Sequence, residues 1–256
     1  MKKQTSLAVL LCAAVLSSCG TKTFQDITGP VASARIKFFH FGVNAPGVNF
    51  YANTAKMTAI VSSTGTESTT GSIYGGVVAG GFYSAIAPGQ YTLTGKIAAT
   101  VDNGLAISTA TATIADGKNY SFYMSGLYDP VAKTTDGFVV EDAFGATIDY
   151  TVAYVRLVNA SSNANPMTLY AKSQVTTVET AVGAAVAYKG AGTFTALPQD
   201  VYDLSTRYAG SATNVFARTG VSFLAGRVYT IGARGDVTVT STTATNRPFL
   251  DNTANR

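Results

Sequence analysis

The sequence predicts an all-β protein with two tandem immunoglobulin-like antiparallel β-sandwich repeats behind a lipoprotein signal peptide. The main observation is an internal repeat. The segment at residues 37–52, KFFHFGVNAPGVNFYA, returns at residues 156–171 as RLVNASSNANPMTLYA, and an offset of 119 residues aligns the two without a gap. Short alternating segments separated by turn residues are typical of a sandwich. Because one antiparallel sheet would leave an apolar face uncovered, we expect two packed sheets in each repeat.

The composition fits a secreted β protein better than a cytosolic enzyme and argues against a nucleic-acid partner. Hydrophobic residues make up 46% of the chain and charged residues only 12%, which is about half the usual share. Small polar residues, β-branched residues and tyrosine suit strands whose outer face is solvated but scarcely charged. The net charge is +4 and falls to +2 without Lys2 and Lys3, and the basic residues are scattered singly. No basic groove is therefore expected.

Residues 1–18 are predicted to be a lipoprotein signal peptide. Two lysines precede an apolar run that is too short to span a bilayer. The segment LSSCG at residues 16–20 resembles a bacterial lipobox, and this resemblance implies that Cys19 is lipidated and becomes the first mature residue. Cys12 leaves with the leader, so Cys19 has no disulfide partner in its own chain. An ordinary secretory signal with an incidental cysteine is the alternative.

Residues 19–33 are interpreted as a lipidated tether to the membrane. The segment is polar and contains glycine and proline without a clear period. Gly20 occupies the position where enterobacterial lipoproteins retained at the inner membrane carry aspartate. We therefore expect an anchor in the outer membrane, on either its periplasmic or its surface face.

The first sandwich repeat is expected over residues 34–145. Its leading strand, residues 34–41, should turn Ile36 and Phe38 to one face and Arg35 and Lys37 to the other. Further alternating segments follow, separated by turn sequences such as VNAPG and APGQ. The glycine pairs at residues 75–76 and 80–81 resemble a phosphate loop only superficially, since no Lys-Ser/Thr or helix follows. We interpret them as easing a bulged strand.

The second repeat is expected over residues 146–256. IAPGQY at residues 86–91 becomes LPQDVY at 197–202, and ADGKNYS at 115–121 becomes LAGRVYT at 224–230. The offset shrinks slowly, as expected when only loops change length. Tyrosines that recur in both copies should serve the shared fold as core or corner residues. The recurring pairs are Tyr51/Tyr170, Tyr74/Tyr188, Tyr91/Tyr202 and Tyr120/Tyr229.

The repeated segments resemble a bacterial family, the domain-of-unknown-function family forty-three ninety-seven. The resemblance rests on RLVNASSNANP at residues 156–166, LPQDVY at 197–202 and AGRVYT at 225–230, with fainter copies in the first repeat. Gln199 and Asp200 replace the usual glycine turn. The resemblance implies a secreted or lipid-anchored β-sandwich protein, often with two copies of the domain. It implies no established activity.

The sequence predicts no catalytic residue, no cofactor and no metal site. His40 is the only histidine and aligns with Asn159, which predicts a structural or exposed polar role. No G-x-S-x-G or H-E-x-x-H motif is present. A group of carboxylates is interpreted as a solvated loop rather than a calcium site. Its members are Asp129, Asp136, Glu141, Asp142 and Asp149.

Three aromatic residues without a counterpart in the other copy are the candidate ligand contacts. Tyr128, Phe138 and Phe144 lie in or beside the long segment between the repeats. Exposed loop aromatics can stack on sugars or on partner proteins. Core packing is the alternative for each of them.

These observations predict a non-enzymatic, lipid-anchored cell-envelope protein that serves as a structural or interaction module. Its membrane partner would be reached through the lipid on Cys19, and a protein or glycan partner would be bound by the globular part. The alternative is a carbohydrate-binding surface lipoprotein of a glycan-uptake system. An enzyme is disfavoured because no nucleophile, base and acid occur together in a recognisable pattern.

Overall fold

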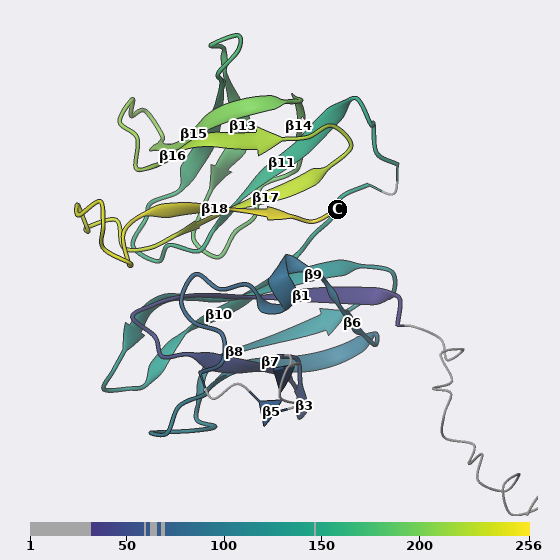
Figure 1. Cartoon of the computed structure of the whole chain (residues 1–256), viewed down its shortest axis with the longest axis vertical. Coiled ribbons are helices and arrows are strands. Elements are labelled where there is room, and N and C mark those ends of the chain that lie inside the picture. Colours follow the sequence, from purple (N-terminus) through teal and green to yellow (C-terminus); the bar gives the residue numbers. More distant parts are fainter. Residues whose placement is uncertain (1–31, 59, 62–65, 68–69, 146) are drawn as a thin grey trace, which may run out of the picture. The chain divides into compact units, whose positions relative to one another are not determined.

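The computed structural model describes residues 32–58, 60–61, 66–67, 70–145 and 147–256 (Figure 1). The leader, Cys19 and most of the predicted tether lie outside these residues. The described chain consists of β-strands, turns and one short 3₁₀ segment, η1 (Val78–Gly81). The predicted all-β class is thus confirmed. Within the described residues, no helix has the length and apolar character needed to cross a membrane.

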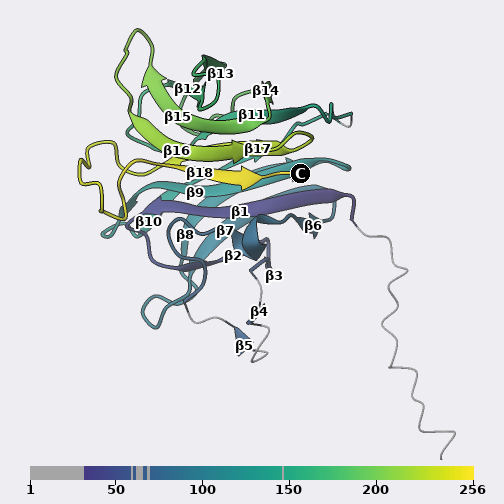
Figure 2. The ribbon, with the colours of Figure 1, turned by 45° about the horizontal axis from the view of Figure 1, so that its top comes forward.

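The first repeat contains two four-stranded sheets. The inner sheet has the order β10-β9-β1-β6, and the outer sheet has the order β3-β2-β7-β8. Figure 2 shows β1, β9 and β10 in one layer, with β2, β7 and β8 in the next. The strands are β1 (Ala34–Val43), β2 (Val48–Ala52), β3 (Ala55–Lys56), β6 (Ser84–Ile86), β7 (Gly89–Ile97), β8 (Ala106–Ile114), β9 (Asn119–Asp129) and β10 (Thr134–Glu141). A two-stranded ribbon joins β4 (Ile60–Val61) to β5 (Thr66–Glu67).

The second repeat contains the same arrangement. Its inner sheet has the order β14-β11-β17-β18, and its outer sheet has the order β13-β12-β15-β16. The strands are β11 (Val152–Asn159), β12 (Met167–Ser173), β13 (Glu179–Val186), β14 (Thr195–Pro198), β15 (Asp200–Tyr208), β16 (Phe216–Phe223), β17 (Val228–Arg234) and β18 (Phe249–Ala254). Four sheets of four strands agree with the predicted tandem sandwiches.

Each inner sheet contains one parallel pair, so the sandwiches are antiparallel except at this position. β1 runs parallel to β9 with Phe38 opposite Phe122, and β11 runs parallel to β17 with Leu157 opposite Ile231. Phe38 and Leu157 are the residues that the 119-residue offset pairs. The internal sequence repeat therefore reports equivalent strands in equivalent registers.

Each repeat buries its own apolar core between its two sheets. In the first repeat, Ile36, Phe38, Phe50 and Phe122 are fully buried, and the Phe38 and Phe50 rings stack with centroids 5.4 Å apart. The second core is built around Leu157 and the strands facing it. Alternation along the leading strands supplies these residues, as the sequence predicts.

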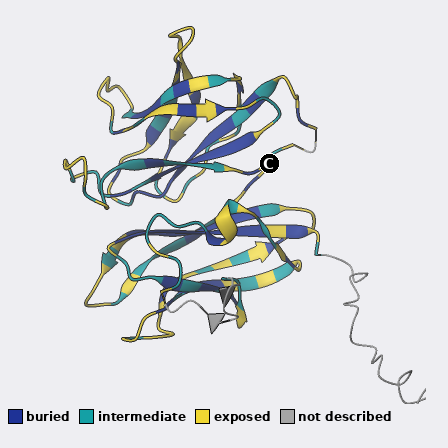
Figure 3. Cartoon of the chain, in the orientation of Figure 1, coloured by how far each residue is buried: buried dark blue, intermediate teal, exposed yellow. Residues whose placement is uncertain are grey.

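The second face of each inner sheet is also buried, although the sequence pattern predicts only one apolar face for each leading strand. β1 and β17 are buried along almost their whole length (Figure 3). A third apolar cluster contains residues of β1, β9, β10 and β11 and thus joins the two inner sheets. We call the contact between these sheets the seam. Its apolar members are Phe39, Phe41, Tyr123, Phe138, Val140, Val158 and Ala160.

Tyr91 and Tyr202 make equivalent hydrogen bonds in the two repeats, as expected of tyrosines that serve the shared fold, whereas the Tyr188 hydroxyl contacts Asp136 of the other repeat. The Tyr91 hydroxyl donates to the Ala87 carbonyl at 3.0 Å, and the Tyr202 hydroxyl donates to the Pro198 carbonyl at 2.8 Å. Each bond closes a corner before a strand, which is the role of a tyrosine corner in sandwich folds.

The glycine pairs of the first repeat lie in a loop and in η1, not in a bulged strand, so that interpretation was wrong. Gly80 and Gly81 have φ angles of 64° and 87°, which favour glycine. A Cβ at Gly75 would stand 2.9 Å from a guanidinium nitrogen of Arg234 in the other repeat. Gly75 therefore lets the backbone approach this arginine closely.

Candidate functional site

Lys37 and Arg156, which the internal repeat aligns, both direct a cationic side chain from their own repeat into the seam. They occupy equivalent positions on β1 and β11, opposite Ser121 and Thr230 respectively. Both residues are buried, with 1% and 2% of their surface exposed. A buried charge needs a partner with good geometry, because removing it from water is costly. Each cation finds its partners at the end of the other repeat's last strand.

Arg156 binds the end of β10 in the first repeat. Its Nη1 donates to the Glu141 carbonyl at 2.9 Å, and its Nη2 forms an ion pair with Asp142. The two charged side chains are 3% and 0% exposed. The Nε atom donates to Thr230 Oγ1 at 3.1 Å. Each of the three guanidinium nitrogens thus donates a hydrogen bond.

Lys37 makes the equivalent contacts at the end of β18 in the second repeat. Its Nζ donates to the Ala254 carbonyl at 2.6 Å and to Asn255 Oδ1 at 3.2 Å. Glu141 pairs with Tyr120 and Ala254 with Tyr229, so the two acceptor positions are equivalent. Burial lowers the pKa of Lys37 to about 8, against the opposing field of Asp142.

An aromatic ring covers each of these cations. The Lys37 ammonium lies 4.2 Å from the centre of the Tyr83 ring, and the Arg156 guanidinium lies 4.6 Å from that of Phe194. Cations are attracted to ring faces at these distances. The Tyr83 hydroxyl also donates to Asp142 Oδ2 at 2.6 Å, and burial followed by the Asp142 charge raises its pKa. Asp142 thereby joins the two halves of the network.

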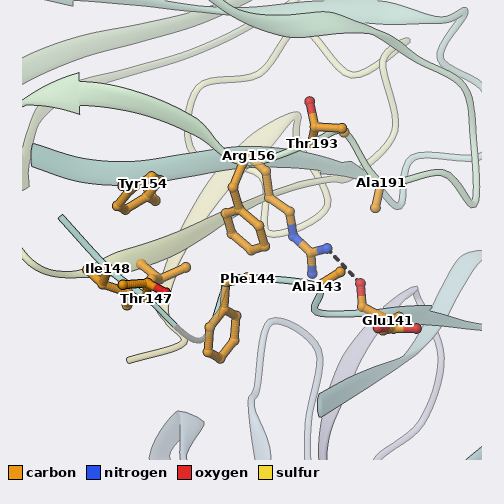
Figure 4. Close-up of a pocket in the computed structure, with 13 residues that line it drawn as sticks. Glu141, Ala143, Phe144, Thr147, Ile148, Tyr154, Arg156, Ala191 and Thr193 are labelled. Carbon is orange, nitrogen blue, oxygen red and sulfur yellow. Dashed lines mark hydrogen bonds between the residues drawn. The ribbon is translucent and has the colours of Figure 1, made fainter. Parts of the chain in front are cut away.

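A pocket of about 410 Å³ opens beside Arg156 (Figure 4). Its lining includes Phe144 and Thr147 from the segment after β10, Tyr154 from β11 and Phe194 from the segment before β14. Figure 4 shows the guanidinium of Arg156 directed toward Glu141. The Phe144 and Phe194 rings meet edge to face with centroids 6.1 Å apart. We call this cavity the seam pocket.

A second hollow of about 320 Å³ lies next to the seam pocket and is related to it by the internal repeat. Tyr83, Arg35 and Asn119 line it where Phe194, Tyr154 and Val228 line the seam pocket. Phe144 lines both cavities. Phe144, which the segment after β10 supplies, is therefore shared by two related hollows.

The structure divides the three candidate aromatics. Phe144 is partly buried and lines the seam pocket. Phe138 lies on β10 and is 7% exposed, with its ring stacked on that of Tyr123 at 5.1 Å, so it follows the core-packing alternative rather than lying in an exposed loop. Tyr128 lies near the end of β9 and packs against the first core. These two residues face apolar clusters because alternation along their strands directs them there.

His40 is fully buried, which rules out the exposed position considered from the sequence. The contact of Nε2 with the Pro46 carbonyl, at 2.9 Å, requires the imidazole to donate. Burial lowers its pKa, so the ring is neutral near pH 7. Asn159 is buried at the equivalent position and donates to the Val186 carbonyl at 3.2 Å. Both side chains tie their strand to a neighbouring segment of their own repeat.

The carboxylates grouped in the sequence have separate partners. Asp129 accepts hydrogen bonds from the turn that follows β9, and Asp136 pairs with Lys189 at 2.9 Å across the seam. Glu141 pairs with Lys118 at 3.0 Å. Asp149 accepts from Thr151. Asp142 pairs with Arg156 and accepts a hydrogen bond from Tyr83. Because each carboxylate has its own partners, the five side chains do not converge on one point.

Sequence reasoning found one aromatic residue of the seam pocket and missed the cations and rings behind it. The alignment of Lys37 with Arg156 was visible, since both are basic at one offset. Their direction across a seam was not visible, because an alternating strand looks the same whether its second face meets water or another sheet. A run of large aromatics on that face, at Phe39 and Phe41, was the available indication.

Comparisons with known proteins give a family match and weak likenesses to solved structures. A family model described as Domain of unknown function (DUF4397) matches residues 34–170, more than half of the chain, and its match ends within β12. None of the curated proteins matches the chain. The solved structures that are similar include the Bacillus anthracis TIE protein, at 15% identity over 78% of this chain and 32% of that one. The chain spans about a third of its length, and the TM-score of 0.24 gives this likeness no weight.

Proposed function

The chain belongs to this family of domains of unknown function, and from that premise we propose that it is a non-enzymatic, lipid-anchored cell-envelope protein. In this proposal Cys19 carries the lipid, and residues 19–33 connect it to the folded body in the outer membrane. The folded body acts as an interaction module that binds its partner at the seam pocket. The identical strand order of the repeats supports two copies of the family domain.

The observation that carries the proposal is the position of Phe144 at the seam pocket. The ring projects from a segment between strands, is only partly buried and meets Phe194 at the edge of a concave surface. Binding sites are usually concave and apolar with a few placed polar groups. Aromatic side chains in such pockets provide much of the free energy of binding between proteins. Apolar side chains of Ile148 and Val228 complete the lining.

The state of the ionisable groups supports a binding role over a catalytic one. Arg156 is held by Asp142 and by two neutral acceptors, and Glu141 pairs with Lys118. A general acid or base must exchange a proton with a substrate within hydrogen-bond reach. Groups already committed to ion pairs and main-chain acceptors are poorly suited to this task.

Photo-crosslinking in the envelope tests the proposal. A benzophenone amino acid would replace Phe144 in the full chain, and the same group at Phe82 would serve as control. Phe82 is 78% exposed and does not line the seam pocket. We expect a discrete adduct from position 144 and none from position 82. Equal labelling at both positions, or none at 144 in intact cells, would contradict binding at the seam pocket.

One observation favours the alternative of a carbohydrate-binding surface lipoprotein. Phe144 lines the seam pocket together with Thr147 and Tyr154, which carry hydroxyl groups, and a pocket with aromatic rings and hydroxyl groups suits a sugar. A glycan array probed with the soluble body would test this. Glycan binding that is lost in Phe144→Ala and kept in Phe82→Ala would establish that the seam pocket binds sugar. An array without signal would favour a protein partner.

A further inference from the structure

One end of the second repeat carries exposed apolar side chains, and we call it the apolar end. The residues are Tyr150, Val175, Val178, Val201 and Leu224, with exposures of 69%, 80%, 61%, 36% and 49%. They come from the segment before β11, the β12–β13 hairpin, the start of β15 and the turn after β16. Contiguous apolar surface of this kind marks an interaction site.

Hydrogen bonds and close packing hold these segments together. The Gln174 amide donates to the Val201 carbonyl at 2.9 Å, which seats the hairpin beside β15. The Ala225 amide donates to Gln199 Oε1 at 3.1 Å. A Cβ at Gly226 would stand 2.8 Å from the Tyr150 ring, so this glycine lets the ring lie against the turn. The apolar end is therefore one surface rather than scattered residues.

The fold itself does not require these apolar residues. The first repeat has Gln90 where the second has Val201, and Ala115 where it has Leu224. Its β2 ends at Ala52 and β3 begins at Ala55, whereas the second repeat has five residues, 174–178, between β12 and β13. Both exposed valines of the hairpin belong to this longer connection. The two copies thus share a scaffold, and only the second presents the apolar end.

The apolar end lies on the side of the body where the predicted tether joins it. The tether leads into the start of β1, and Tyr150 precedes the start of β11. Phe144 lines one hollow with Arg35 of β1 and another with Tyr154 of β11, so the two strands begin beside each other. A chain from Cys19 to Ala32 spans at most about 45 Å when fully extended. The body therefore stays close to the membrane that holds the lipid.

We propose that the apolar end docks on the lipid surface to which Cys19 is anchored. This inference rests on the proposed lipid anchor. Valine and leucine side chains would enter the boundary between headgroups and acyl chains, as the apolar faces of peripheral proteins do. Tyr150 has the amphipathic ring that is enriched at this depth. Docking would fix how the seam pocket is presented, because Tyr154, which lines the pocket, lies on β11 close to Tyr150 in the sequence.

The absence of tryptophan from the sequence allows a direct test. Val178→Trp would place a single fluorophore at the apolar end of the full lipidated chain. Val131→Trp is the matched control, since Val131 is 91% exposed in the turn between β9 and β10, at the opposite end of the first repeat. Both proteins would be reconstituted into phosphatidylethanolamine/phosphatidylglycerol vesicles with brominated acyl chains. We expect several-fold stronger quenching at position 178 than at position 131.

The outcomes separate docking from anchoring. A chain that does not float with the vesicles would overturn the lipid anchor and the docking together. A chain that floats, with equal and weak quenching at both positions, would overturn docking and leave the anchor intact. If the emission of the tryptophan at position 178 shifts to the blue as the protein concentration rises in the absence of vesicles, the apolar end binds a second copy of the chain instead. Val175→Asp should reduce quenching of a Leu224→Trp reporter if lipid is the partner.

Discussion

Replacing Arg156 by methionine should destabilise the protein far more than the same change at the equivalent Lys37. Arg156→Met leaves the Asp142 carboxylate fully buried without its cation, although Tyr83 and Ser121 still donate to it. Removing one partner of a buried ion pair typically costs about 3–5 kcal/mol. Lys37→Met leaves a main-chain carbonyl and the Asn255 amide oxygen without a donor and removes the contact with the Tyr83 ring, but Asp142 keeps its ion pair with Arg156. That loss should cost about 1–2 kcal/mol.

Urea unfolding at pH 7 of a Cys19→Ala background, followed by tyrosine fluorescence and circular dichroism, would measure both changes. The double variant Arg156→Met/Asp142→Asn removes the uncompensated charge, and it should recover about 1–3 kcal/mol relative to the sum of the single changes. The slope of the free energy against urea should stay constant, which shows that the unfolded state has not changed.

The reasoning would be refuted if Arg156→Met and Lys37→Met lowered the free energy of unfolding equally. It would also be refuted if the loss in the double variant equalled the sum of the losses in the two single variants. Either result would mean that the ion pair across the seam carries no particular weight. A cost below about 1 kcal/mol for Arg156→Met would place Asp142 in contact with water.

The remaining predictions concern the anchor, the buried histidine and the tyrosine corners. Cys19→Ala should release the protein from membranes, and a variant that still sediments with membranes after a high-salt wash would place the anchor elsewhere. His40→Asn should lower the free energy of unfolding by about 1–3 kcal/mol at pH 7, because the buried Pro46 carbonyl loses the hydrogen bond from the imidazole. Burial lowers the His40 pKa, so the wild type loses stability as the pH falls below about 6.5. In urea titrations, the difference in the free energy of unfolding between the wild type and His40→Asn should therefore be smaller at pH 5 than at pH 7. Tyr91→Phe and Tyr202→Phe should each cost about 1 kcal/mol, and unequal costs in thermal unfolding would contradict equivalent corners.

The sequence was sufficient for the strand content and the register of equivalent strands. The shared offset of Phe38 and Leu157 predicted that they would occupy the same place in two sandwiches, and both lie on leading strands that run parallel to a partner. Recurring tyrosines predicted the corners for the same reason. These features depend on local alternation and turns, which a sequence displays directly.

The seam could not be predicted, because it depends on which outer faces meet. Lys37 alternates with apolar neighbours as a solvated lysine would, yet it reaches Ala254 at the far end of the chain. Phe138 was a candidate ligand contact because it lies in or beside the long segment between the repeats, and its burial arises from Tyr123 and the seam. Phe144 was identified because it lies in the segment without a counterpart in the other copy. Phe194 was missed because its counterpart in the first repeat is a tyrosine, Tyr83, so the two positions do not stand out as a recurring pair.

Scanning calorimetry of residues 20–256 tests the central claim most directly, namely that the seam joins both repeats into one folding unit. Residues from Ala32 to Arg256 form one compact unit, with an apolar cluster shared by the two inner sheets. The account predicts a single transition whose calorimetric and van't Hoff enthalpies agree, and Arg156→Met should shift that whole transition to lower temperature. Two separate transitions, with only one of them moved by Arg156→Met, would contradict it.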